Sequence, residues 1–343
     1  MKKYLLTLII FCFSFSAFSA ETPINLILHH FVPPSHSPHK NMLVPWAREV
    51  EKLSKFKVRI SIAPKMSLGG KPSQLIKQVQ EGKVDLVWTV NGYSGTDFIR
   101  SEVFELPFVH TNDPVATNLA MREMFESDLR QDYDAKNVEV MFLHVTQGHA
   151  IQTKGYTPRR PEDLRSKRIR VPVRTQAWAV QELGGYKVKV PVTKIHQVLT
   201  RNVADTILIP GDIVGVIGLE RQISTFTEGP NKTRFANTVF QVSMNKDKWK
   251  SLPPDIKKAF RKASDKTWLR KVGKLWQDDD QAGITRLKQF QRTHNILTEE
   301  EINAFREALK NVESRWIAEA TERDLDAMMI IEKARKLIKK YSK

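Results

Sequence analysis

Strand and helix patterns alternate strictly between residues 24 and 90. Ile24–Leu28 and Val84–Val90 are short apolar runs, and Lys57–Ala63 alternates apolar with polar residues, so all three predict β-strands. Between them, Leu43–Leu53 and Ser73–Gly82 place apolar residues three and four positions apart, which predicts helices. A strand as apolar as Val84–Val90 is typical of a parallel sheet that is covered on both faces. This order therefore predicts an open α/β sheet.

A second, smaller α/β unit is predicted in the middle of the chain. Helical patterns over Ala177–Leu183 and Lys194–Arg201 alternate there with strand patterns over Lys187–Val190 and Thr206–Ile209. Farther along, we expect a strand over Thr238–Met244, a long helix from Pro253 or Pro254 to about Phe290, and a terminal helix that begins at a capping box of Thr298 and Glu301.

The first residues predict an exported protein. Two lysines precede an apolar run, Leu5–Phe15, and Ala17 and Ser19 suit the −3 and −1 positions of a cleavage site. Because this run is too short to span a bilayer, we predict a secretory signal peptide over residues 1–19 and a periplasmic mature protein. The single cysteine, Cys12, lies inside that segment, so the mature chain would have no disulfide or thiolate chemistry.

The net charge narrows the choice of partners. It is +17 for the whole chain, and loss of the two lysines of the signal peptide lowers it to +15. Such a charge suits nucleic acid, anionic lipid or anionic small molecules. An exported protein meets little nucleic acid, and no basic motif here is interleaved with aromatic residues. We therefore expect an anionic small molecule or a membrane surface as partner, and no nucleic acid.

The segment Pro161–Pro172, PEDLRSKRIRVP, is the leading candidate for ligand binding. A proline and two acids open a helical turn, Lys167–Val171 alternates as a strand, and the closing proline ends it because proline has no N–H for the ladder. Arg168 and Arg170 lie on one side of this strand. An arginine at a strand end can hold a carboxylate through two parallel hydrogen bonds. The alternative is a solvated basic edge strand, since charged runs usually face water.

A group of histidines leaves a second kind of site open. His29, His30, His36 and His39 lie close together in the sequence, and the last two would share a helix face, as in some metal sites. Alternatively, His30 or His149 donates a hydrogen bond to a ligand in a cleft.

Catalysis is not expected. The chain has neither a G-x-S-x-G elbow nor an H-E-x-x-H helix, and the acids Asp278–Asp280 lie in a predicted helix where we expect them to face water. We also expect no cofactor.

Four segments in order along the chain carry a family resemblance. They are LGGKPSQLIKQVQEGKVDL (Leu68–Leu86), EVFELPFV (Glu102–Val109), PEDLRSKRIRVP (Pro161–Pro172) and SLPPDIKKAF (Ser251–Phe260). Together they resemble the substrate-binding proteins of tripartite ATP-independent periplasmic (TRAP) transporters, of the DctP type. The resemblance begins at about Ile24 and extends to the terminal helices.

The resemblance implies an α/β protein with a type II-like periplasmic-binding-protein fold of two lobes around a cleft. Its sheets would be mixed, a long helix would brace the hinge, and further helices would close the chain. In this sequence, residues 20–147 would form lobe I and 148–234 lobe II. The chain would return to lobe I over 235–275, and 276–343 would hold the long helix and C-terminal helices packed on lobe II.

The resemblance also implies capture of an organic acid by the arginine at position 170. Many members carry a second arginine at the position of Ala150, and its absence disfavours a sialic acid. Apolar residues replace a polar wall over 206–210, so we expect a monocarboxylate with an apolar or aromatic body. The candidate ligand-binding residues are Arg170, Asn91, Trp88, His30, Gln147, His149, Trp178, Ile209 and Pro210, with Tyr93 as further aromatic surface.

The function implied is extracytoplasmic capture of an organic acid anion. The protein, expected as a monomer, would deliver its ligand to the small and large permease subunits of a TRAP transporter. Two alternatives stay open: a periplasmic sensor component that presents the ligand to a receptor, and a periplasmic metal-binding protein.

Overall fold

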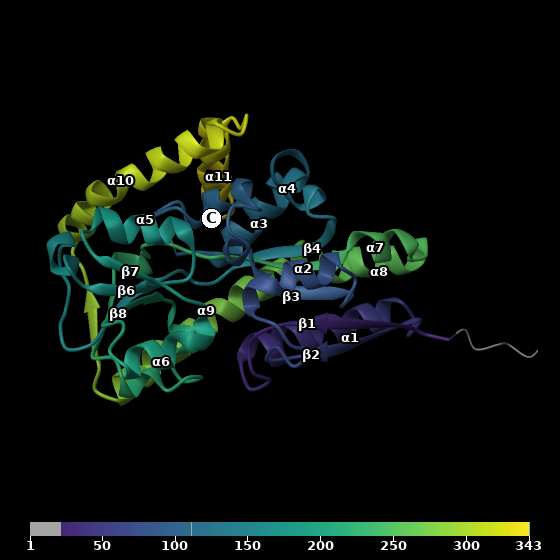
Figure 1. Cartoon of the computed structure of the whole chain (residues 1–343), viewed down its shortest axis with the longest axis horizontal. Helices are drawn as coiled ribbons and strands as arrows, with labels where there is room; N and C mark the ends of the chain where they lie inside the picture. Colours follow the sequence, from purple (N-terminus) through teal and green to yellow (C-terminus); the bar gives the residue numbers. More distant parts are fainter. Residues whose placement is uncertain (1–21, 111, 343) are drawn as a thin grey trace, which may run out of the picture.

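Two mixed β-sheets organise the chain (Figure 1). The computed structural model describes residues 22–110 and 112–342, so the signal peptide expected over residues 1–19, with Cys12, lies outside the described residues. One sheet has five strands in the order β2-β1-β3-β10-β4, and the other has six in the order β11-β9-β5-β8-β6-β7. We call the unit around the first sheet lobe I and the unit around the second lobe II. The predicted fold class, α/β with two lobes and mixed sheets, is confirmed.

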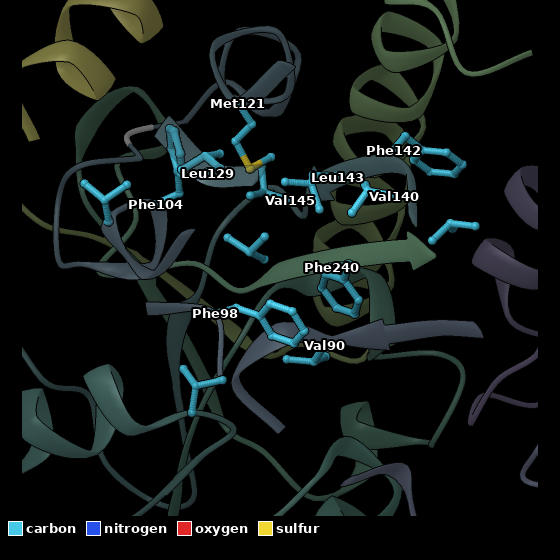
Figure 2. Close-up of a cluster of buried hydrophobic side chains, with 14 of the residues drawn as sticks. Val90, Phe98, Phe104, Met121, Leu129, Val140, Phe142, Leu143, Val145 and Phe240 are labelled. Atoms are coloured by element: carbon cyan, nitrogen blue, oxygen red, sulfur yellow. The ribbon is translucent and has the colours of Figure 1, made fainter. Parts of the chain in front are cut away.

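Lobe I is built from the first part of the chain and one returning strand. Its strands are β1 (Ile24–His29), β2 (Val58–Ala63), β3 (Leu86–Val90), β4 (Val138–Val145) and β10 (Val239–Asn245). β1 pairs in parallel with β2 and β3, whereas β10 is antiparallel to β3 and β4. Every residue of β3, β4 and β10 is buried, because layers cover both faces of the sheet. Figure 2 shows side chains of these three strands gathered in one core.

Helices cover the sheet of lobe I. They are α1 (Val44–Leu53), α2 (Leu75–Gln80), α3 (Pro114–Met124), α4 (Arg130–Ala135), α7 (Lys246–Ser251) and α8 (Pro254–Ala263). In Figure 2, Met121 of α3 points toward Val145 of β4, two fully buried side chains.

Lobe II contains the second sheet. Its elements are β5 (Ala150–Thr153), β6 (Arg168–Val171), α5 (Arg174–Glu182), β7 (Tyr186–Lys189), α6 (Ile195–Thr200), β8 (Thr206–Ile209), β9 (Thr225–Glu228) and β11 (Thr293–Ile296). β6 lies between β7 and β8 and pairs in parallel with both. Its interior place contradicts the interpretation of this segment as an edge strand. The sequence pattern missed β5, β9 and β11, which have four residues each and mix polar with apolar side chains.

Three connections run between the two sheets. Two run side by side near His149, whose N–H donates to the carbonyl of Ala236 (2.8 Å) while its own carbonyl accepts from the N–H of Phe235 (3.1 Å). The third is helix α9 (Lys266–Gln289), which contacts β4 in lobe I and the 3-10 helix η8 (Gly211–Ile213) in lobe II.

The long helix begins later than expected. The prediction of one helix from Pro253 or Pro254 to about Phe290 is wrong, because α8 ends at Ala263. Asp265 then caps α9 by accepting hydrogen bonds from the N–H groups of Thr267 and Trp268.

The last two helices cover different lobes (Figure 1). α10 (Glu299–Thr321) begins at the predicted capping box, which is confirmed, and packs on α5 of lobe II. α11 (Ala327–Tyr341) packs on α3 of lobe I, so the expectation that all C-terminal helices pack on lobe II is wrong for α11. The reason is its apolar stripe, which includes Ile330, Ala334 and Ile338 and is buried there. Across residues 22–110 and 112–342, no helix has the length and hydropathy needed to span a membrane.

Candidate functional site

A small cavity of about 60 Å³ lies between the two lobes. Lobe I, the return strand and α9 contribute Phe31, Val32, His36, Trp88, Val90, Tyr93, Thr146, Thr238, Phe240 and Trp276. Lobe II contributes His149, Arg170, Pro172, Val192, Ile209, Pro210, Asp212 and Ile213. Most of these side chains are apolar or aromatic, as is usual in sites for small organic ligands.

Arg170 is the buried cation of this cavity. It lies in β6 opposite Val188 of β7 and Ile207 of β8, and it is only 1% exposed. Its Nε donates to the carbonyl of Val190 (3.0 Å) and its Nη1 to the carbonyl of Leu208 (3.4 Å). These bonds fix the guanidinium plane, because both acceptors are backbone carbonyls, one within β8 and one just after β7.

No carboxylate neutralises this cation within the part of the chain that the structure describes. The contacts of Arg170 are two backbone carbonyls and the hydroxyl of Tyr93. Burial lowers the pKa of Arg170 to about 10, and Tyr93 opposes that shift. The guanidinium therefore keeps its charge at neutral pH, and a buried unpaired charge is costly until an anion joins it.

His149 supports the cavity as a neutral side chain. Its Nδ1 donates to the amide oxygen of Gln176 (3.0 Å), and its Nε2 accepts from the hydroxyl of Thr238 (3.0 Å). Burial, together with the nearby charge of Arg170, lowers the pKa of His149 to about 3. His149 therefore contributes no positive charge, and Arg170 is the cation of the cavity.

Stacked rings form an apolar part of the cavity wall. Trp88 is stacked with Phe31 on one side, with centroids 5.1 Å apart, and with Phe240 on the other, with centroids 5.2 Å apart. The indole N–H of Trp88 donates to Nε2 of His144 (2.9 Å), so its polar atom is satisfied away from the cavity. This wall suits a flat, apolar ligand.

A larger vestibule of about 650 Å³ shares Phe31, Tyr93 and Pro172 with the cavity. Four exposed lysines line it: Lys65, Lys71, Lys189 and Lys194. No acidic residue is among its described lining residues. A mouth with charge of one sign attracts ligands of the opposite sign.

Four of the nine predicted site residues do not line the cavity. Asn91 is held in the core of lobe I, where its side-chain amide bonds Ser101, Tyr133 and Gln241 away from the cavity. Gln147 lies at the crossing between the lobes, and its amide donates to the carbonyl of Asn112.

His30 and Trp178 also lie elsewhere, because nearby side chains engage them. His30 packs edge-on behind Trp88, with its Nε2 2.9 Å from Nδ1 of His39. Trp178 lies on α5 between the guanidinium groups of Arg174 and Arg315, which are 4.6 and 4.4 Å from its ring. The structure brings together the other five: Arg170, Trp88, His149, Ile209 and Pro210.

Sequence reasoning missed several lining residues that come from distant segments. Phe240 and Trp276 lie on β10 and α9, and periodicity showed only that these elements have buried faces. Asp212 lies in the turn just after the strand Thr206–Ile209, so its place near a strand end was the available signal.

The histidines do not form the metal site that the sequence left open. His29 contacts Gln78, His30 contacts His39, and His36 contacts Asp212. Among the residues with a described structure, no three His, Cys, Asp or Glu side chains are placed to hold a metal ion.

The burial of Asp280 contradicts the expectation that residues 278–280 face water. It is fully buried and bonds both Nη atoms of Arg234, at 3.2 and 2.7 Å, while Glu228 lies 2.7 Å from the same guanidinium. Its Oδ1 also accepts from the N–H of Gly211 (2.6 Å). Only Asp278 matches the expectation, with a side chain that is 62% exposed and pairs with Lys274. Asp280 therefore ties α9 to the turn that carries Asp212.

Comparison with known proteins finds a matching family profile and solved structures of similar fold. The sequence profile of the bacterial extracellular solute-binding proteins, family 7 (DctP), matches residues 28–319. A TRAP solute-binding protein from a marine metagenome, specific for aromatic acid ligands and solved with metahydroxyphenylacetate, is 29% identical with a TM-score of 0.89, over 93% of this chain and 100% of that chain.

Two further solved structures have the same fold. A TRAP solute-binding protein from Rhodoferax ferrireducens T118, with copurified benzoate, is 28% identical with a TM-score of 0.88, over 93% of this chain and 98% of that chain. One from Bordetella bronchiseptica, with bound (R)- and (S)-mandelate, is 21% identical with a TM-score of 0.85, over 93% of this chain and 99% of that chain.

Proposed function

Because the chain belongs to family 7 of the bacterial extracellular solute-binding proteins, the DctP family of TRAP transporters, we propose that its interlobe cavity captures an aromatic monocarboxylate. Proteins of this family bind small organic acids outside the cytoplasm and work with membrane permease components. The ligand would be handed by the monomeric protein, without chemical change, to the small and large permease subunits of the transporter.

One observation carries this proposal: Arg170 is a buried guanidinium without a carboxylate partner in a cavity walled by aromatic rings. A carboxylate supplies the missing negative charge and can accept two hydrogen bonds from the planar fork. An aromatic body replaces water against Phe31, Trp88 and Phe240, which face neighbouring rings and aliphatic side chains.

The ligands of the two relatives at 28–29% identity also support an aromatic monocarboxylate as the ligand class. Both were solved with an aromatic monocarboxylate, metahydroxyphenylacetate in one and benzoate in the other. Position 150, where many family members carry a second arginine, holds an alanine that is fully buried in β5 beside Ile209, which disfavours a ligand that needs two arginines.

Isothermal titration with a small ligand panel tests the proposed function. We expect benzoate or a substituted benzoate to bind, and benzamide, which has the same ring but no charge, to bind about 100-fold more weakly. The acid should be recovered unchanged after incubation. Equal binding of benzamide and benzoate, or no binding of any aromatic acid, would contradict the proposal.

Ile209 provides a second test, aimed at the apolar wall. It is 4% exposed at the cavity, so Ile209→Asn should weaken binding of an aromatic acid by about 1–3 kcal/mol, the scale of a lost apolar contact plus a polar mismatch. Titration calorimetry measures the change. Ile296→Asn is the matched control, because Ile296 is 54% exposed on β11 and should leave the affinity unchanged. A wild-type affinity in Ile209→Asn would remove Ile209 from the site.

A further inference from the structure

We infer that Asp212 and His36 form a second polar contact in the cavity. This pair would accept a hydrogen bond from a hydroxyl on the aromatic body of the ligand. The inference rests on the proposed function and narrows its ligand class to hydroxylated aromatic monocarboxylates. Arg170 would hold the carboxylate, and the pair of Asp212 and His36 would select the hydroxyl.

The two residues meet across the interlobe boundary. Asp212 belongs to η8 in lobe II, and His36 lies in the segment after β1 in lobe I. Nε2 of His36 donates to Oδ2 of Asp212 at 3.2 Å, and each side chain is 5% exposed. Both line the cavity that contains Arg170.

Each member of the pair has one polar atom left over. Oδ1 of Asp212 and Nδ1 of His36 are buried and have no hydrogen-bond partner in the described chain. A carboxylate oxygen can only accept, and the Nδ1 of a neutral imidazole accepts when Nε2 carries the proton. Oδ1 of Asp212 therefore calls for a donor, as does Nδ1 of His36 when the imidazole is neutral, and leaving a buried acceptor unpaired is unfavourable.

The backbone around Asp212 is held firmly, as a specificity contact requires. The N–H of Gly211 donates to Oδ1 of Asp280, and Asp280 is fixed by Arg234. Helix α9 approaches this turn so closely that a Cβ on Gly283 would lie 1.9 Å from the carbonyl oxygen of Gly211. Asp212 is thus positioned before a ligand arrives, which favours discrimination between similar ligands.

The connection between the two polar contacts is short. Leu208, whose carbonyl accepts from Arg170, is four residues before Asp212, and Ile209 and Pro210 between them line the cavity wall. A ligand that reaches both contacts needs a carboxylate at one place and a donor at another, on a body that is otherwise apolar. A hydroxybenzoate has these three features.

An outer groove of about 410 Å³ also borders His36 and Asp212, together with Ser37 and Asp279. If the free acceptors were satisfied from that side, the ligand would gain nothing from a hydroxyl. The affinities of related acids distinguish these two cases.

The first experiment uses the wild-type protein and matched ligands. Dissociation constants are measured by titration calorimetry for benzoate and for its 3- and 4-fluoro and 3- and 4-hydroxy derivatives, because fluorine is close to hydroxyl in size but cannot donate. We expect at least one hydroxybenzoate to bind at least about tenfold more tightly than benzoate and its fluoro counterpart. Equal binding of all five acids would overturn this inference and leave the proposed function standing. If none of the five binds, the proposed function fails as well.

The second experiment removes the pair as a unit. The double variant His36→Leu/Asp212→Leu has no polar atom at this position, so the preference for the hydroxybenzoate over benzoate, both measured in this variant, should fall to within about threefold. The matched control is Lys274→Leu/Asp278→Leu, which removes an exposed ion pair and should keep the full preference. A preference that survives in the folded double variant assigns the hydroxyl to another contact. Should that variant fail to fold, the wild-type ligand series decides alone.

Discussion

Replacing Arg170 with alanine is expected to weaken binding of the aromatic acid by about 2–5 kcal/mol, the loss seen when one partner of a buried charged pair is removed. The carboxylate would then be buried among aromatic and aliphatic side chains without a counter-charge, since His149 is neutral and no described carboxylate or second cation touches this position. Titration calorimetry with the acid that binds wild type measures the effect.

Two further variants test whether binding depends on the hydrogen-bond geometry of arginine and on its position at residue 170, in addition to its charge. Arg170→Lys keeps the charge but offers a single compact donor group, so it should bind more weakly than wild type and more tightly than Arg170→Ala. Arg168→Ala is the matched control from the same strand, because Arg168 is 48% exposed and pairs with Asp205 instead. Its effect should stay below about 0.5 kcal/mol.

The folded state of each variant must be checked, because Arg170 also bonds the carbonyls of Val190 and Leu208. Circular dichroism and the melting temperature without ligand serve that purpose. If folded Arg170→Ala binds as wild type does, the carboxylate anchor is not Arg170. If Arg168→Ala alone abolishes binding, the anchor has been assigned to the wrong arginine.

Replacing Asp280 with alanine should lower the free energy of unfolding by about 3–5 kcal/mol, the usual cost of breaking a buried ion pair from one side. Asp280 is the partner of both Nη atoms of Arg234 and accepts the N–H of Gly211, so its loss leaves a buried guanidinium with fewer acceptors and a buried amide without one. Urea unfolding followed by circular dichroism measures the difference.

Asp278→Ala controls for the loss of a carboxylate from the same helix. Asp278 makes an exposed i,i+4 pair with Lys274, and such pairs contribute less than about 0.5 kcal/mol. A loss below about 1 kcal/mol in Asp280→Ala would show that the cluster around Arg234 does not stabilise the junction of α9 with lobe II.

Local patterns in the sequence predicted much of the fold. The strands predicted over Ile24–Leu28 and Val84–Val90 and the capping box of Thr298 and Glu301 are all present in the structure. These features depend on neighbouring residues, because helix and strand periods and capping bonds span only a few positions. The short strands β5 and β11 were missed, because their four residues form neither a continuous apolar run nor a regular alternation of apolar and polar side chains.

For the site, the sequence by itself determined that Arg170 ends a strand between a helical turn and a proline, and family motifs pointed to its role. Only the tertiary structure decided which other side chains reach it. Asn91 follows a strand end, as a ligand-binding residue would, but its side chain is hydrogen-bonded to Tyr133 and Gln241 in the core. In contrast, Asp212, His36 and Phe240 come from separate parts of the chain and line the same cavity. The physical reason is that a residue pattern reports which face of its own element is buried. What that face packs against depends on contacts between residues far apart in sequence, such as Asp280 with Arg234 and Gly211, and these form only when the lobes are assembled.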